Sequence, residues 1–311
     1  MATDWRKEFF DNFKIYDKST HQRAAQIIRE NMKEHLFTYK SISTEERIKY
    51  AIEQIETETL YLAHPLKFND PFDCSLGISV KDSSSLLTPD LLSLTFGKRF
   101  GIKKGDERLN IMSDFLKDDL NKKPKEKAFF DKMLEENIKK NRKVIGESNR
   151  VYCFTEKSEN IPMWYHYTDN FSGICLQYDT NTFPIDVLNH LFPVCYTDEL
   201  ENMYNKLACF SEKDFKKQNI YGSVPLQKMK DWEYEEEWRV VYNIGELGYS
   251  YEDALKLGKE HGVKIPFTKP SCIYLGKEIS EENENIFREL GRKHSIPVKK
   301  MELSVFGIEF V

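Results

Sequence analysis

The sequence predicts an α+β protein in which a mixed, mostly antiparallel sheet, either continuous or split, is flanked by helices and carries a charged helical insertion. Helical and strand-like segments follow one another without the steady strand–helix–strand rhythm of a parallel sheet. The chain has 311 residues, of which 40% are hydrophobic, enough for a substantial core. We therefore expect a single α+β domain over 35–311, preceded by a helical extension over 1–34.

The first part of the chain is expected to mix helices and strands. Apolar residues recur at three- and four-residue spacing in the helical segments, and Ser43 with Glu46 forms a capping box ahead of the third one. The expected helices cover 4–13, 19–35 and 46–56. The expected strands cover 35–41 and 58–65.

A charged helical insertion is predicted over about 82–149. Lys, Asp and Glu are dense in 104–149, and apolar residues recur there at helical spacing, as in FFDKMLEENIKKNRKVI. A charge run of this kind is typical of a solvated helix face. A surface that binds a partner is the alternative.

The last part of the chain is strand-rich. Its strands are recognised as short runs of β-branched and aromatic residues. The expected strands cover 150–156, 171–179, 192–197, 232–244, 271–277, 296–303 and 306–311. The expected helices cover 161–170, 198–215 and a segment capped by Ser280.

Composition limits the function classes. The net charge of −5 disfavours nucleic acid as a partner. No apolar run is long enough to span a membrane, and the N-terminus lacks a signal peptide, so we expect a cytoplasmic protein without membrane contact. Six cysteines occur without a CxxC pair, which predicts buried, reduced thiols and no metal site.

A glutamate-rich stretch, WEYEEEWR at 232–239, is the strongest candidate for chemistry. If it is one strand, Glu235, Glu237 and Arg239 lie on the same face. Neighbouring carboxylates repel, which raises the pKa of one of them unless a cation intervenes. The stretch is either an exposed edge face or an acidic catalytic face, with Arg239 as the cation.

A second stretch, MWYHYTDN at 163–170, surrounds His166 with aromatic residues. On a helix, Met163, His166 and Tyr167 share one face and Trp164 lies on another. A histidine among aromatic residues is more often structural than catalytic. We keep His166 as a candidate catalytic residue beside that interpretation.

Two shorter stretches complete the candidate site. Tyr39 and Lys40 end an early strand, where either could face a ligand phosphate or be a polar edge residue. In FNDPF, Asn69 favours a turn and the following proline pushes Asp70 to an extended conformation. The turn is either well packed or holds Asn69 and Asp70 at the mouth of a pocket.

Taken together, these blocks resemble the bacterial family of unknown function DUF2971. The resemblance rests on LYLAHPLKFNDPFDC, VYCFTE, MWYHYTDNFSGICLQYD, WEYEEEWR and IYLGK in this order, and covers roughly 35–278. The chain departs from the family where Lys40 follows the tyrosine, since arginine is more usual there. The family implies no settled activity.

A second resemblance is to the ADP-ribosyltransferase-like fold. It implies that an early strand supplies Tyr39 or Lys40 to the ribose or phosphate of NAD, that a middle strand supplies Thr155, and that an aromatic residue stacks on nicotinamide. Trp164 and Tyr167 are the candidates for stacking. Glu237, with Glu235 as its partner, would stabilise the cation that develops when the glycosidic bond breaks.

Two hypotheses follow. The first is a nucleotide-dependent enzyme of bacterial stress response or phage defence, with NAD as substrate and no firm cofactor, which cleaves NAD or transfers ADP-ribose to a macromolecular acceptor. The second is a non-catalytic binding or effector module with a protein partner. The chain lacks a glycine-rich phosphate loop, a nucleophile elbow and an HExxH motif.

Overall fold

The computed structural model describes residues 4–70, 73–74, 84, 87–89, 92–93, 101–103, 105–198, 219–250, 252–253, 262–305 and 307–311. The chain forms two compact units. Unit 1 comprises 1–25, 68–146 and 195–229. Unit 2 comprises 26–67, 147–194 and 230–311.

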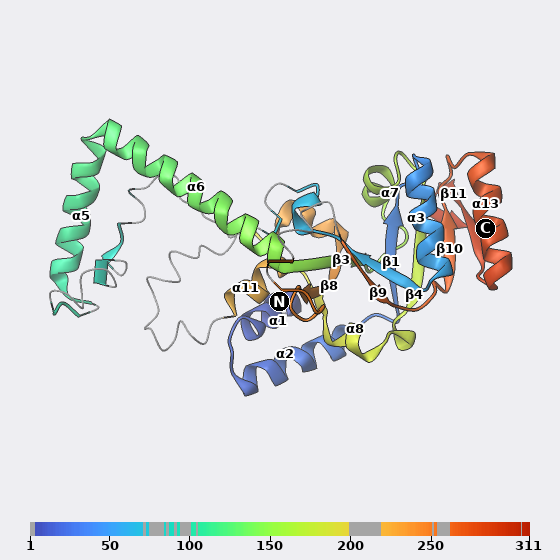
Figure 1. The fold of residues 1–311 in the computed structure, drawn as a ribbon, viewed down its shortest axis with the longest axis horizontal. Coiled ribbons are helices and arrows are strands. Elements are labelled where there is room, and N and C mark those ends of the chain that lie inside the picture. The colour runs from blue at the N-terminus through green and yellow to red at the C-terminus, as the bar shows by residue number, and fades with distance from the viewer. Residues whose placement is uncertain are drawn as a thin grey trace. The chain divides into compact units, whose positions relative to one another are not determined.

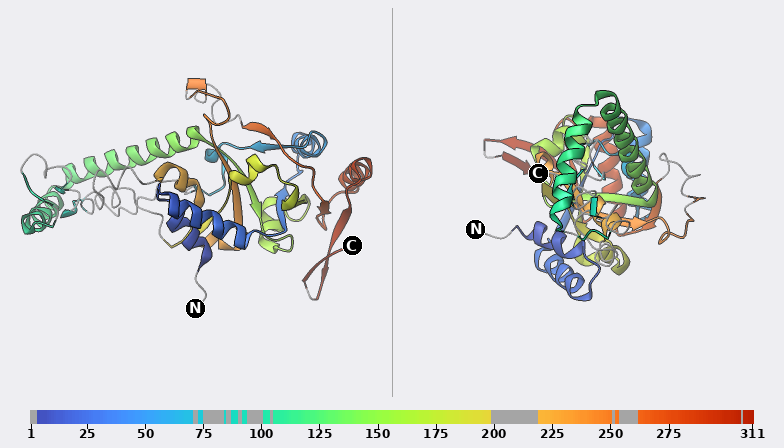
Figure 2. Two further views of the ribbon diagram at one scale, coloured as in Figure 1. Left: turned by 90° about the horizontal axis from the view of Figure 1, so that it is seen from below. Right: turned by 90° about the vertical axis from the view of Figure 1, so that its left-hand side faces the viewer.

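Unit 2 is built around an eight-stranded mixed sheet in the order β12-β11-β10-β4-β1-β3-β8-β5 (Figure 1). All neighbours are antiparallel except β10 and β11, which confirms the predicted α+β class. The hairpin of β11 and β12 lies at one end of the sheet (Figure 2). The strands are β1 His35–Lys40, β3 Asn149–Thr155, β4 Ile174–Asp179, β5 Leu191–Pro193, β8 Glu237–Asn243, β10 Cys272–Leu275, β11 Val298–Ser304 and β12 Gly307–Phe310.

A second, two-stranded sheet in unit 2 pairs β2 (Thr59–Leu62) with β9 (Val263–Pro266). The helices of this unit have clear end signals in the sequence. Helix α13 begins at the predicted cap Ser280, whereas α3 is capped by Thr44 rather than by Ser43. The helices are α3 Glu45–Glu56, α7 Ile161–Tyr167, α8 Ile185–Asn189 and α13 Glu281–His294.

Unit 1 is mainly helical. It also contains a two-stranded parallel sheet of β6 (Cys195–Thr197) and β7 (Gln227–Met229). Its helices are α1 Trp5–Phe13, α5 Glu107–Asn121, most of α6 Pro124–Ser148, and α11 Ile220–Ser223; α2 Lys18–Asn31 begins in this unit. The predicted domain limits at 35 and at 82–149 stay predictions.

The elements expected over 192–197 and 198–215 have different outcomes. The strand expected over 192–197 is two strands, because the chain leaves the main sheet after Pro193 and β6 pairs with β7 instead. Most of the helix expected over 198–215 lies outside the described residues. No helix in the described part of the chain is long and apolar enough to cross a membrane.

The five cysteines in the described part of the chain form no disulfide with one another, and four of them are buried. Burial raises the pKa of Cys175 and Cys272, and it raises the pKa of Cys195 to about 12. A thiol with a raised pKa holds little thiolate at neutral pH and reacts slowly. These cysteines pack as small apolar residues, as the sequence predicted.

Candidate functional site

Neighbouring residues of β1 lie on opposite faces of the main sheet, because side chains alternate along a strand. Phe37 lies opposite Thr155 of β3, and Thr155 lies opposite Glu237 of β8. Tyr39 is two residues beyond Phe37 and therefore shares its face, while Lys40 does not. We call the side with Tyr39, Thr155 and Glu237 the Glu237 face.

The opposite side carries Lys40, Tyr152 and Tyr178, and we call it the Lys40 face. The Lys40 ammonium lies 5.3 Å from the centre of the Tyr152 ring. Helix α3 covers this face, since the buried Gln54 amide donates to the hydroxyls of Tyr152, at 2.9 Å, and Tyr178, at 2.7 Å. The sheet thus separates Lys40 from Glu237, two residues that were expected to serve one site.

On the Glu237 face, Glu237 and Arg239 form a buried, two-pronged ion pair. Arg239 Nε and Nη2 each donate to one carboxylate oxygen of Glu237 at 2.9 Å. The two residues are 4% and 0% exposed, and β8 lies between β3 and β5. The prediction of Arg239 as the partner cation is confirmed, whereas the alternative of an exposed edge face is wrong.

Glu235 does not lie on the same strand as Glu237. Residues Lys230–Glu235 form a 3₁₀ helix, Glu236 has a positive φ of 43°, and β8 begins only at Glu237. The expected single strand over 232–244 is therefore wrong. Glu235 is buried, and its Oε1 accepts a hydrogen bond of 2.6 Å from the Tyr167 hydroxyl. Its carbonyl accepts one from Thr155.

Tyr39 and Trp164 fix the chain next to this network. The Tyr39 hydroxyl donates to the Lys157 carbonyl at 2.9 Å, and burial strongly raises its pKa. Trp164 is fully buried, packs edge-on against Tyr39 at 5.2 Å and donates to the Ser158 carbonyl. With no exposed surface, the Trp164 ring has no face on which a ligand could stack in this conformation.

His166 lies away from this network. Its side chain is exposed and contacts the Tyr165 ring edge-on at 5.2 Å. Met163, three residues earlier on the same helix, is buried, whereas His166 is not. The helix is short, and only its Met163 and Trp164 side is covered. The proposed catalytic role of His166 stays a prediction.

Asn69 and Asp70 belong to unit 1. Asn69 is exposed, Asp70 is buried, and the Asp70 carbonyl accepts from the Asp73 amide at 3.1 Å, which closes a turn. Phe68 packs against a small apolar cluster of this unit, while Phe72 lies outside the described residues. Phe68, just before the turn, thus takes part in packing, and the role of Asn69 and Asp70 at a pocket mouth stays a prediction.

A pocket of about 590 Å³ opens on the Lys40 face of unit 2. It is bounded by the end of β1, helix α3 and the strand pair β2–β9, and four cationic side chains line it together with two carboxylates. The cations are Lys40, Arg47, Lys67 and Lys264, and the carboxylates are Glu46 and Glu53. A pocket with this excess of positive charge suits an anionic ligand.

Two of the cations are held in place by neighbours. Lys264 Nζ lies 2.6 Å from Glu53 Oε1. Arg47 Nη1 donates to the Ser41 hydroxyl at 2.5 Å and lies 3.6 Å from Asp169 Oδ2. All of these side chains are partly exposed, so a ligand could reach them without rearrangement of the core.

Two partly exposed tyrosines lie on the pocket wall. Tyr50 of α3 and Tyr61 of β2 are 55% and 42% exposed, and their rings are 6.5 Å apart and within 8° of parallel. The Tyr50 hydroxyl donates to Glu46 at 2.7 Å, and this hydrogen bond raises its pKa. The pair offers a surface on which a planar ring could stack.

A left-handed turn holds Asp169 beside the pocket. Asp169, Asn170 and Phe171 have φ values of 49°, 57° and 67°, a run that is unfavourable for residues with side chains. Phe171 O accepts from the Glu278 amide at 3.0 Å, and a Cβ at Gly276 would lie only 2.0 Å from it. Contacts with Gly276 and Glu278 thus hold this unfavourable turn in place, as is often seen for strained segments near functional sites.

Sequence reasoning missed most of the pocket. Arg47, Tyr50 and Gln54 recur at three- and four-residue spacing, so the helical pattern could have placed them on one face of α3. Lys264 gave no such signal, because it reaches the pocket through the pairing of β9 with the distant strand β2. In the described part of the chain, no cluster of histidine, cysteine or acidic residues is placed to hold a metal ion.

The comparisons with known proteins point to one family. Residues 163–240 match the model of a family described as a protein of unknown function (DUF2971). Neither the curated proteins nor the solved structures include a match to the chain. The matched segment holds most of α7, all of β4 and the start of β8, and thus both the MWYHYTDN and WEYEEEWR motifs. The resemblance to DUF2971 is therefore confirmed over residues 163–240.

Proposed function

We propose that unit 2 binds a phosphate-bearing nucleotide in the pocket on the Lys40 face. The observation that carries the proposal is the gathering of Lys40, Arg47, Lys67 and Lys264 around one pocket. The whole chain has a net charge of −5, so a local excess of cations does not follow from composition. Ammonium and guanidinium groups are the usual partners of phosphate oxygens.

The tyrosine pair supports a nucleotide over a simple anion. Stacking of a base on an aromatic side chain contributes about 1–3 kcal/mol and tolerates any base. Tyr50 and Tyr61 are partly exposed and line the same pocket as the cations. Gln54 uses its amide nitrogen for two tyrosine hydroxyls, which leaves its amide oxygen to accept from a ligand.

NAD remains the nucleotide suggested by the resemblance to ADP-ribosyltransferase-like proteins. The predicted catalytic role of Glu237 and Glu235 gains no support from their environment, since Glu237 has both oxygens on Arg239 and lies on the other face. The carboxylates on the pocket side are Glu46 and Glu53. If the protein cleaves NAD, these are the carboxylates we assign to the reaction.

The alternative function is a binding or effector module without catalysis. It shares the pocket and differs only in the fate of the ligand. Incubation with NAD, followed by chromatographic detection of free nicotinamide, separates the two. Release of nicotinamide that is lost in Glu53→Gln supports the enzyme. Binding without turnover supports the module.

The test of binding is thermal unfolding in the presence of NAD, NADP, ATP, GTP or ADP-ribose. A ligand at a hundred times its dissociation constant adds about 2.7 kcal/mol to the free energy of unfolding. We expect a raised melting temperature with at least one nucleotide, and a smaller rise in Lys264→Ala and Tyr50→Ala. Lys299→Ala, an exposed lysine outside the pocket lining, is the control.

Absence of a shift with every nucleotide would contradict the proposal. So would a shift that persists unchanged in Lys264→Ala and Tyr50→Ala, because the ligand would then bind elsewhere.

A further inference from the structure

The long helix α6 of unit 1 exposes most of its described side chains. No described residue between Pro124 and Lys143 is buried, and burial begins only near the end of the helix, at Ile145. Most of the stability of a protein helix comes from packing of an apolar face, since isolated helices are marginal in water. A contact beyond those that the described residues of one chain make would therefore stabilise the exposed part of α6.

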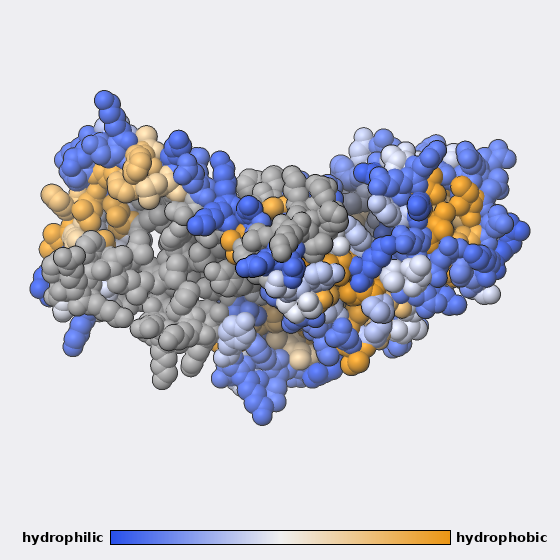
Figure 3. All heavy atoms as spheres, in the orientation of Figure 1, coloured by the Kyte–Doolittle hydropathy of each residue, from blue (hydrophilic) through white to orange (hydrophobic). Residues whose placement is uncertain are grey.

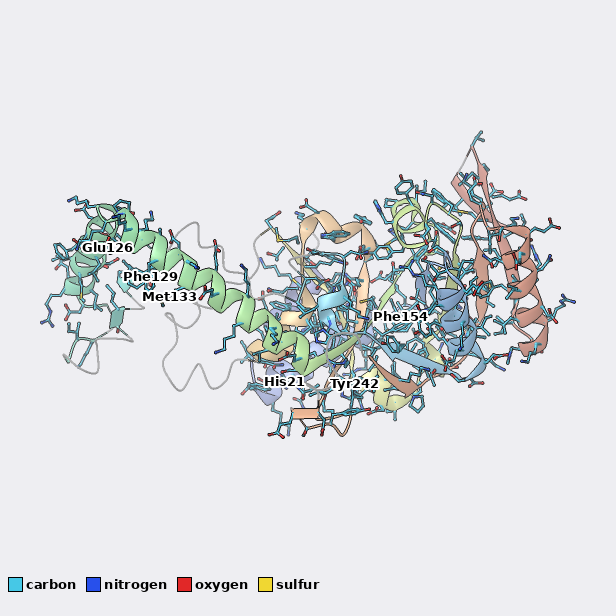
Figure 4. All side chains as sticks on the ribbon, turned by 45° about the horizontal axis from the view of Figure 1, so that its top comes forward. His21, Glu126, Phe129, Met133, Phe154 and Tyr242 are labelled. Atoms are coloured by element: carbon cyan, nitrogen blue, oxygen red, sulfur yellow. The ribbon has the colours of Figure 1, made fainter. Side chains whose placement is uncertain are left out.

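Large apolar side chains are exposed on this part of α6 and on α5, which precedes it. Figure 1 shows α5 and α6 diverging from a common turn, and Figure 3 shows apolar side chains over α5 and the start of α6. Figure 4 labels Phe129 and Met133 along the first turns of α6. We call this set the α5–α6 patch: Ile111 (66% exposed), Phe115 (67%), Phe129 (62%), Phe130 (47%) and Met133 (43%).

The spacing of these residues makes the patch continuous along each helix. Ile111 and Phe115 are four residues apart on α5, as Phe129 and Met133 are on α6, and such pairs share a helix face. The Phe129 and Phe130 rings also contact each other at 5.8 Å. Each helix thus presents an apolar stripe flanked by charged residues.

The size of the patch fits the core of a protein interface. Its three phenylalanines alone expose roughly 350 Å², given the area of an aromatic side chain. A stable dimer buries about 800 Å² on each partner, of which the apolar core is the larger share. The patch can therefore supply a large part of the apolar core of such an interface.

The charges of the two helices indicate what covers the patch. Helix α5 has two more acidic than basic residues, whereas α6 has two more basic than acidic residues. A second copy of the chain offers both the apolar stripe and the opposite charge if α5 of one copy packs on α6 of the other. Two-fold symmetry then makes both contacts at once.

We propose that the α5–α6 patch is a homodimer interface, in which α5 and α6 of two chains form a four-helix arrangement. This proposal adopts the second interpretation of the charged segment 104–149, a surface that binds a partner, and the partner is a second copy of the chain. The proposal does not depend on the nucleotide pocket, which lies in unit 2.

The test is the molar mass of the full chain in solution, measured by sedimentation or light scattering over a concentration series. We expect a dimer. Phe115→Asp and Phe129→Asp place a charge in the apolar contact and should each weaken association by on the order of 30-fold, as loss of an interface hot spot does. Val305→Asp is the control, since Val305 is 93% exposed and lies in unit 2.

Each outcome decides the proposal. A monomer across the whole series overturns it, as does a dimer that Phe115→Asp and Phe129→Asp leave intact. An equal loss of association in Val305→Asp would mean that the interface does not lie at the α5–α6 patch. The helix pairing has its own test, a mixture of Ile111→Cys and Met133→Cys chains under oxidation. A disulfide between the two variants supports α5 against α6, and a disulfide only within one variant contradicts it.

Discussion

The two faces of the main sheet in unit 2 differ in how they use charged residues. On the Glu237 face, acidic groups are buried and each finds a fixed partner, as in the contacts of Glu237 with Arg239 and of Glu235 with Tyr167. On the Lys40 face, Arg150 is buried, but the charged groups around the pocket stay partly exposed. The difference teaches that a conspicuous cluster of glutamates can be part of the core, while the open site is made of residues unremarkable in the sequence.

The largest expected effect is the loss of stability when Arg239 is removed. It distinguishes a structural Glu237–Arg239 pair from a catalytic one. Arg239→Ala leaves the buried Glu237 carboxylate without its main partner, which costs about 3–5 kcal/mol of stability. Denaturation by urea measures this loss. Lys40→Ala, on the opposite face, should change stability by no more than about 0.5 kcal/mol, as substitutions of partly exposed residues do.

If Arg239→Ala were as stable as the parent chain, the Glu237–Arg239 pair would not be needed for stability, and the contrast between the two faces would be wrong. Glu237 would then be free to take part in catalysis, as first predicted. Glu237→Gln tests the other partner of the same pair. A marked loss of stability supports a structural role for Glu237, and loss of activity alone supports a catalytic role.

A smaller effect is expected from the contact between α7 and the 3₁₀ helix. Tyr167→Phe removes the hydroxyl that donates to Glu235, and hydrogen bonds to charged groups contribute about 1.5–3 kcal/mol. Tyr165→Phe is the matched control, since Tyr165 is 52% exposed on the same helix. Equal unfolding free energies for the two variants would show that the Tyr167 contact carries no stability.

The contrast between the faces also explains what could be predicted from the sequence. The strand over β4 and the helix capped by Ser280 were predictable, because local pattern and capping residues determine them. The start of β8 was not, since it depends on a left-handed Glu236 that only the surrounding fold imposes. The pocket was not predictable either, because Tyr61 and Lys264 meet through the pairing of β2 with β9, two strands about 200 residues apart.

The smallest expected effect concerns the left-handed turn beside the pocket. The hydrogen bond from Ser41, followed by that from Ser43 and the charge of Arg47, holds the pKa of Asp169 below its ordinary value of about 3.9. A lowered pKa means that ionised Asp169 stabilises the fold above its ordinary pKa, and that this contribution disappears as the pH falls through the lower, folded value. Because Asp169 is 42% exposed, the contribution should be about 0.2–1 kcal/mol, as for surface ion pairs.

Asp169→Asn should therefore lower stability slightly at neutral pH and have no effect in acid, where the parent carboxyl is also neutral. Unfolding by urea at both pH values measures the difference, and a deficit that persists in acid would mean that the amide disturbs the turn itself. The same variant connects the turn to the pocket, since Asp169 and Ser41 together hold Arg47. If Arg47 binds phosphate, Asp169→Asn should weaken nucleotide binding at neutral pH by more than it weakens the fold, because a less restrained guanidinium loses more conformational freedom when it binds.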